Sequence, residues 1–85
     1  MEGKQIGILF RHFYYDEYYD CMIYGPFDVQ FPNNTTLGEL APGRRFEVLY
    51  RGRWIDTCLG FNRVANRYYL ERIGYIDAIN MTVRI

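Results

Sequence analysis

The sequence predicts a single small all-β barrel of five to six short strands, spanning residues 1–85 as one domain. Short segments rich in β-branched and aromatic residues recur along the chain, turn-forming Gly, Pro and Asn separate them, and no segment has a convincing helical period. Aromatic residues make up 19% of the chain. Because each buries on the order of 150–250 Å², a fold of this size can still form an adequate core.

The first part of the chain predicts an opening β-hairpin. Residues 5–13 predict the first strand, residues 14–17 the reversal, and residues 18–24 the returning strand. Two prolines and two consecutive asparagines predict that residues 25–34 are mainly a connection, with a brief extended piece at residues 27–31.

A turn region and a half-buried strand follow. Residues 35–40 predict one helical turn with Thr35 or Thr36 as its cap, and Pro42-Gly43 predicts a tight turn. Residues 45–50 predict a strand because the pattern has period two. Phe46, Val48 and Tyr50 fall on one face, and Arg45, Glu47 and Leu49 fall on the other.

The next segments predict two further strands. Arg51-Gly52 predicts a tight hairpin turn that leads into a partner strand at residues 54–61. Residues 62–66 contain turn-forming asparagines, and residues 67–73 predict another strand, which Gly74 ends.

The chain ends with a predicted single 3₁₀ turn at residues 76–80 and a short last strand at residues 81–85. Met81, Val83 and Ile85 of that strand fall on one face. Short strands at this spacing favour a closed or nearly closed barrel.

Charge is unevenly distributed along the chain. The formal net charge is zero, which argues against non-specific binding to phosphate backbones. Residues 1–43 nevertheless hold two basic and six acidic residues, whereas residues 44–85 hold eight basic and four acidic residues. Two interpretations are open: the halves pair within one barrel, or an arginine-lined face binds an anionic ligand.

Residue types required for common catalytic and metal sites are scarce. Cys21 and Cys58 are far apart, His12 is the only histidine, and the chain has no serine. These residues predict no zinc site, no redox dithiol and no Ser-His-Asp chemistry, so we expect no enzyme activity, no cofactor and no metal. The first ten residues are too short an apolar run for a signal peptide or a membrane span, so we expect a cytoplasmic protein with reduced thiols that does not bind membranes.

Several segments resemble known small barrels. The run from Glu39 to Leu49, then Gly52-Arg53-Trp54, Gly74-Tyr75-Ile76 and the terminal Val83-Arg84-Ile85, resemble the strand core of SH3-like barrels. Gly7-Ile8-Leu9, Phe46-Glu47-Val48, residues 52–57, residues 67–70 and the same ending are more closely similar to DUF5348, a family of small bacterial and mobile-element proteins of unknown function. The resemblance implies a barrel fold and includes no catalytic motif. Proline-rich peptide recognition does not follow, because Asp77 to Asn80 depart from the SH3 pattern.

The best candidate contact site is the first hairpin. Tyr14, Tyr15, Tyr18 and Tyr19 surround Asp16-Glu17, and Asp20 adds to the acidity. Successive strand residues point to opposite faces, so the tyrosines either pack the end of the barrel or remain outside for a partner. Trp54 is a further candidate, either as a core residue or as a surface platform for stacking.

The sequence therefore predicts a non-enzymatic protein-interaction module, with a protein partner or a homo-oligomer formed through the aromatic patch. It would be an accessory protein of a bacterium, a mobile element or a phage. One alternative is binding of a nucleotide or nucleic acid by Trp54 with Arg51, Arg53, Arg63 and Arg67. Another is a small inhibitor that occupies a host enzyme or sequesters its signalling ligand, which no particular residue supports.

Overall fold

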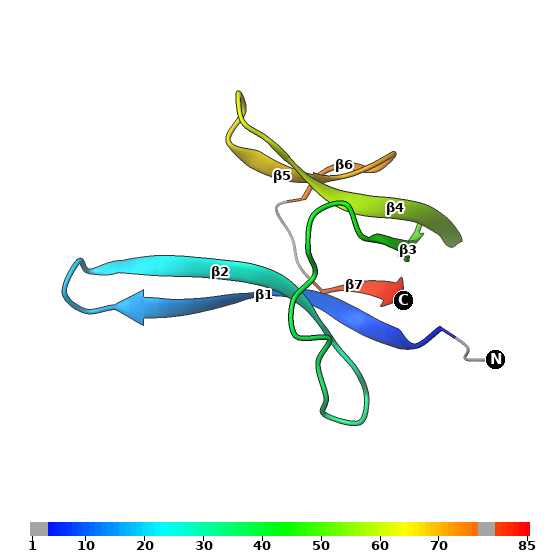
Figure 1. Ribbon diagram of the computed structural model, residues 1–85, viewed down its shortest axis with the longest axis horizontal. Helices are drawn as coiled ribbons and strands as arrows, with labels where there is room; N and C mark the ends of the chain where they lie inside the picture. Colours follow the sequence, from blue (N-terminus) through cyan, green and yellow to red (C-terminus); the bar gives the residue numbers. More distant parts are fainter. Residues whose placement is uncertain (1–3, 77–79) are drawn as a thin grey trace.

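The computed structural model describes residues 4–76 and 80–85, and these form one antiparallel sheet (Figure 1). The described strands are β1 (Ile6–Asp16), β2 (Cys21–Gln30), β3 (Arg45–Tyr50), β4 (Arg53–Asn62), β5 (Arg67–Leu70), β6 (Gly74–Tyr75) and β7 (Met81–Arg84). Their order in the sheet is β2-β1-β7-β3-β4-β5-β6. The all-β prediction is confirmed, but the described strands number seven rather than five or six.

The sheet curls into a half-barrel because its last strand joins the two parts of the chain. β7 lies between β1 and β3, where Val83 pairs with both Gly7 and Val48. At the open side, β2 approaches β5, and the rings of Phe27 and Tyr68 meet edge to face at 5.0 Å between centroids. Side chains therefore close the side at which β2 and β5 share no backbone ladder.

The core consists of ten buried apolar residues from both ends of the sheet. They are Leu9, Phe27, Val29, Phe31, Leu40, Phe46, Val48, Leu59, Leu70 and Val83. The predicted alternation of residues 45–50 is confirmed, because Phe46 and Val48 are buried whereas Leu49 is exposed. Val83 of β7 is buried, and Met81 and the following residue Ile85 pack against the core, as their predicted common face requires.

The connection between β2 and β3 is extended rather than helical. The amide of Leu37 donates to the carbonyl of Val29 at 3.0 Å, and the amide of Leu40 donates to that of Phe27 at 2.8 Å. The predicted helical turn at residues 35–40 is therefore wrong, since these amides bond to the edge of β2. Gly43 then donates to the carbonyl of Leu59 at 3.0 Å, so the connection spans from β2 to β4.

The first hairpin is longer than predicted at both strands. β1 continues to Asp16, whose Oδ1 accepts the amides of Tyr18 and Tyr19 and so starts a turn beyond the predicted reversal at residues 14–17. β2 continues through Pro26, which the sequence placed in a connection. The register shift between Arg11 and Phe13 marks a bulge there, and a bulge accommodates a residue without an amide hydrogen.

The predicted strand at residues 67–73 is correct only over residues 67–70, because residues 71–73 form a turn. β5 ends at Leu70, the amide of Ile73 donates back to the carbonyl of Leu70 at 3.0 Å, and Arg72 adopts a φ of 70°. Gly74, predicted to end a strand, instead begins β6 with a φ of 120°. The predicted 3₁₀ turn at residues 76–80 falls on residues 77–79, which lie outside the described residues.

The tight hairpin at Arg51-Gly52 is confirmed. Tyr50 pairs with Arg53, and both turn residues have positive φ, 53° and 79°, which suits the right-handed twist of the flanking strands. On the neighbouring hairpin, a Cβ at Gly60 would overlap the ring of Tyr69, so a larger residue there would displace that ring.

Asp28 is the buried polar residue that fixes β2 to its surroundings. It is 1% exposed. Its Oδ1 accepts the amides of Val29 at 2.7 Å and Gly38 at 3.0 Å, and its Oδ2 bonds to His12 Nε2 at 2.7 Å. A buried carboxylate is tolerated because all these donors satisfy it.

Replacement of Asp28 by Ala should therefore lower the free energy of unfolding by about 2–4 kcal/mol, since it leaves buried amide donors without an acceptor. Urea denaturation measures this change. His12→Ala, which keeps both amide bonds to Asp28, should cost clearly less. Equal losses for the two variants would contradict this account of Asp28.

An ion-pair cluster on the outer face joins β7 to β3. Arg84 donates to both carboxylate oxygens of Glu47 at 3.0 Å, and Lys4 donates to Oε1 at 2.8 Å. The hydrogen bonds from Arg84, and then those from Lys4, lower the pKa of Glu47 from 4.5 to about 2. A lowered folded-state pKa means that this stabilisation is present above pH 4.5 and is lost as the pH falls toward 2.

Glu47→Gln should reduce stability at neutral pH and flatten its decline between pH 4.5 and 2, because the titrating carboxylate is gone. Urea midpoints measured at successive pH values test this. Glu17→Gln removes an exposed carboxylate from the hairpin turn and should keep the wild-type dependence. An unchanged decline in Glu47→Gln would show that other groups control acid unfolding.

Candidate functional site

All four tyrosines of the predicted contact site are exposed on the first hairpin. Tyr14 and Tyr15 are 60% and 52% exposed in β1, and Tyr18 and Tyr19 are 86% and 70% exposed in the turn. The rings of Tyr18 and Tyr19 pack edge to face, with their centroids 4.8 Å apart. The structure thus places the tyrosines outside the core.

The aromatic residues lie on both faces of the hairpin. Phe13 pairs with Tyr24 and Tyr15 pairs with Met22, so these four side chains share one face. Tyr14 pairs with Ile23 and lies on the other face. Because Tyr14 and Tyr15 are adjacent in one strand, they cannot belong to a single flat patch.

Among the described residues, the exposed part of the hairpin has no neighbouring strand. β7 pairs only with residues Ile6 to Leu9 of β1, and the bonds from Leu37 and Leu40 reach β2 only at Val29 and Phe27. We call residues 10–26, comprising the outer parts of β1 and β2 and their turn, the arm. Figure 1 shows the arm extending away from the rest of the sheet at the left of the view.

A cleft of about 640 Å³ lies between the arm and the β4–β5 hairpin. Its walls are largely aromatic. The arm contributes Arg11, Phe13, Met22 and Tyr24 to the lining, and the opposite hairpin contributes Phe61 and Tyr68. Sequence reasoning missed this cleft. Phe61 and Tyr68 are distant from the arm along the chain, so the sequence does not show that they face it. The only signal of a cleft in the sequence was an excess of aromatic residues over what the core needs.

Arg11 lies in this cleft among three rings. Its guanidinium carbon is 5.2 Å from the ring centre of Tyr24 and 5.0 Å from those of Phe27 and Tyr68. Nε donates to the carbonyl of Gly25 at 3.0 Å. Within residues 4–76 and 80–85, no carboxylate forms an ion pair with Arg11. The Arg11 guanidinium, although surrounded by these rings, can still bind a planar anion along one edge.

Trp54 does not join the tyrosines. It lies at the start of β4, beside the tight hairpin, and pairs with Leu49 on the outer face. The guanidinium of Arg84 covers its ring at 4.3 Å. Trp54 is therefore half-buried under a cation that Glu47 already binds, which corresponds neither to a core position nor to an open stacking platform.

The four arginines of the alternative anionic site lie at opposite ends of β4. Arg51 and Arg53 are at the β3–β4 turn, where the guanidinium of Arg51 lies 5.1 Å from the Tyr50 ring. Arg63 and Arg67 are at the β4–β5 turn, and Arg67 stacks on Tyr75 at 4.1 Å. The structure thus forms two pairs rather than one basic face.

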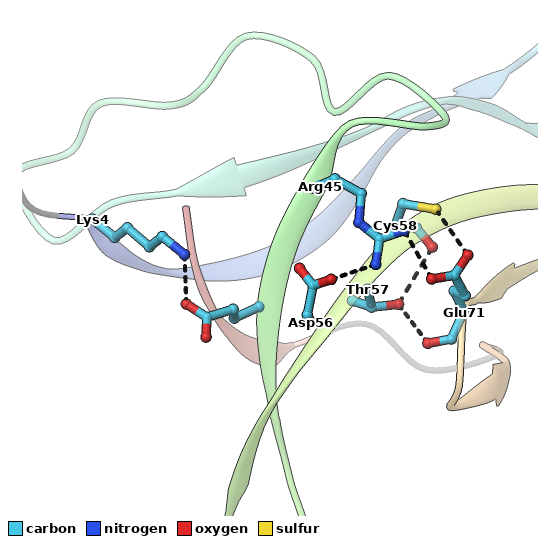
Figure 2. Close-up of polar contacts among 7 residues, drawn as sticks. Lys4, Arg45, Asp56, Thr57, Cys58 and Glu71 are labelled. Atoms are coloured by element: carbon cyan, nitrogen blue, oxygen red, sulfur yellow. Dashed lines mark hydrogen bonds and ion pairs between the residues drawn. The ribbon is translucent and has the colours of Figure 1, made fainter.

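A second polar cluster surrounds Arg45 (Figure 2). Arg45 pairs with Asp56 and, at 2.8 Å, with Glu71, and these hydrogen bonds raise the pKa of its guanidinium. Thr57 Oγ1 donates to the carbonyl of Glu71 at 2.7 Å, and the Cys58 thiol lies 4.0 Å from the Glu71 carboxylate. With its charges paired, the cluster attaches the end of β5 to β4.

The two halves of the chain pair less with each other than within themselves. In the described ranges, Lys4–Glu47 is the ion pair that joins them, whereas Arg45 and Arg84 pair with carboxylates of their own half. No cluster of three metal-ligating side chains occurs among the described residues. In that same part of the chain, no helix has the length and apolar character needed to cross a membrane.

Comparison with known proteins gives one match. Separate searches of curated proteins and of solved structures found no similar protein. The model of the family described as a domain of unknown function, DUF5348, matches residues 13–85. This span includes most of the arm, the lining of the cleft except Arg11, and every strand from β2 onward, and on this match the chain belongs to the DUF5348 family.

Proposed function

We propose that this protein is a non-enzymatic protein-interaction module whose arm forms the contact surface. The observation that supports this most strongly is the exposure of seven large apolar or aromatic side chains within the arm. They are Phe13, Tyr14, Tyr15, Tyr18, Tyr19, Met22 and Tyr24, each between 39% and 86% exposed. Exposed aromatic clusters of this kind mark contact sites, and tyrosine is enriched among the residues that dominate binding energy.

The isolation of the arm adds a second argument. A two-stranded hairpin is only marginally stable alone in water, and residues 13–16 and 21–24 pair with each other but with no further strand in the described chain. A partner that covers one face of the arm would bury its rings and order it at the same time. Unpaired strand edges also offer backbone hydrogen bonds to a partner.

The proposal also includes kinship with SH3-like barrels, an origin in a bacterium or a mobile element, and residence in the cytoplasm. The tight hairpin that opens on Trp54 and the pairing of the last strand with the first support the SH3-like relation. The absence of a proline-rich recognition pattern leaves the arm as the surface favoured for protein contact.

The double substitution Tyr15→Ala, Tyr18→Ala should abolish most partner capture while leaving the fold cooperative, because both rings are exposed. Affinity capture from the native host with the tagged chain, followed by mass analysis of the bound proteins, measures this loss. Leu49→Ala is the matched control: it removes an exposed apolar side chain from β3, the central strand of the sheet, and should retain capture. Unfolding of the double variant, or undiminished capture by it, would contradict the proposal.

Binding of nucleotides or nucleic acids is the weaker alternative, because Arg84 covers Trp54 and the arginines are divided between two turns. We expect the fluorescence of Trp54 to remain unchanged when nucleotides or short oligonucleotides are added at low and at high salt. A response that weakens steeply with salt would indicate phosphate contacts and would favour the alternative.

A further inference from the structure

We infer that the cleft beside Arg11 is occupied by the acidic turn of a second copy of this chain, so that the protein forms a symmetric dimer through exchanged arms. This inference rests on the proposed function, because it names the partner of the arm. It concerns residues 10–26 of each copy and the wall of the β4–β5 hairpin.

Charge complementarity is the first argument. The turn of the arm has three carboxylates, Asp16, Glu17 and Asp20, and none forms an ion pair within the described chain. The cleft contains the guanidinium of Arg11, which has no ion-pair partner among the described residues. Glu39 lines an adjoining cavity of about 210 Å³ that also touches Arg11, but no ion pair joins the two.

The chemistry of the cleft matches the turn in a second respect. The rings of Tyr24, Phe27 and Tyr68 surround the Arg11 guanidinium, and its Nε already donates to Gly25, so the edge that carries its Nη atoms is the part that can bind a carboxylate. Phe13, Met22 and Phe61 provide apolar walls around that edge. The turn offers Glu17 beside the exposed rings of Tyr18 and Tyr19, an acidic group flanked by aromatic ones.

The length of the arm permits both contacts at once. Six residues separate Arg11 from Glu17, which in a strand corresponds to roughly 20 Å. When two arms run antiparallel, with the two-fold axis near Tyr14, each turn lies beside the Arg11 of the other copy. The contact is then isologous, so it closes at two copies and creates no open chain.

The surface buried is sufficient for a moderate dimer. The face formed by Phe13, Tyr15, Met22 and Tyr24, together with Tyr18 and Tyr19, exposes on the order of 600 Å² of side chain per copy. A standard interface buries about 800 Å² per partner, so backbone and turn atoms would supply the remainder. We expect a dissociation constant in the micromolar range.

Charge reversal in two variants tests the contact directly. In the Glu17→Arg variant, two arginines meet at both contacts of the dimer. In the Arg11→Glu variant, two glutamates meet at both contacts. Each variant alone should therefore sediment as a monomer, with dimer affinity reduced about tenfold or more. An equimolar mixture should recover the dimer, because each contact in the mixed pair again joins opposite charges. Sedimentation velocity over the micromolar range measures all three samples.

Arg53→Glu is the matched control, since it reverses a charge at the far end of β4. It should dimerise as the wild type does, and its mixture with Glu17→Arg should give no recovery of Glu17→Arg dimers. Wild-type protein that is monomeric throughout, an unimpaired Glu17→Arg dimer, or a mixture without recovery overturns the inference.

Arg11 also contacts the body of the fold, so cooperative unfolding of Arg11→Glu is checked first. If that variant fails to fold, Glu17→Arg and the double variant Tyr18→Ala, Tyr19→Ala decide, since these side chains lie in the exposed turn. Loss of the dimer in both supports the inference, and retention in either overturns it. A monomeric chain that captures another protein through its tyrosines would overturn the dimer alone, whereas a monomer that captures nothing would overturn both proposals.

Discussion

A mismatch in strand length determines the shape of this protein. β7 has four residues, whereas β1, its neighbour, has eleven. The last strand therefore supports only the inner third of β1, and within residues 4–76 and 80–85 the outer part pairs with β2 alone. The half-barrel, the arm and the cleft between the arm and the β4–β5 hairpin all follow from this difference.

The sequence correctly predicted those features of the fold that depend only on neighbouring residues. The alternation around Phe46 and Val48, and the Arg51-Gly52 turn, depend on neighbouring residues and were confirmed. The extended path near Leu37 could not be predicted locally, because its amide bonds to a carbonyl eight residues earlier. The bulge that accommodates Pro26 likewise depends on strand pairing that a single strand does not reveal.

The candidate site was likewise predictable from the sequence only in part. Composition and spacing identified the tyrosines of the turn, since aromatic residues around a reversal exceed what a core can accept. Arg11 and the opposing Tyr68 were missed because their proximity requires the curl of the whole sheet. Trp54 was identified from its turn, but its covering by Arg84 depends on β7 lying beside β3.

The bulge at Gly25 and Pro26 separates two registers within one hairpin. On the inner side, Asp28 and its partners fix which residues face the core; on the outer side, no such buried group constrains the pairing. Homologues could thus lengthen or shorten the outer segment by residue pairs, or replace its rings, without disturbing the barrel. The length and the rings of the arm can therefore change independently of the packing of the core.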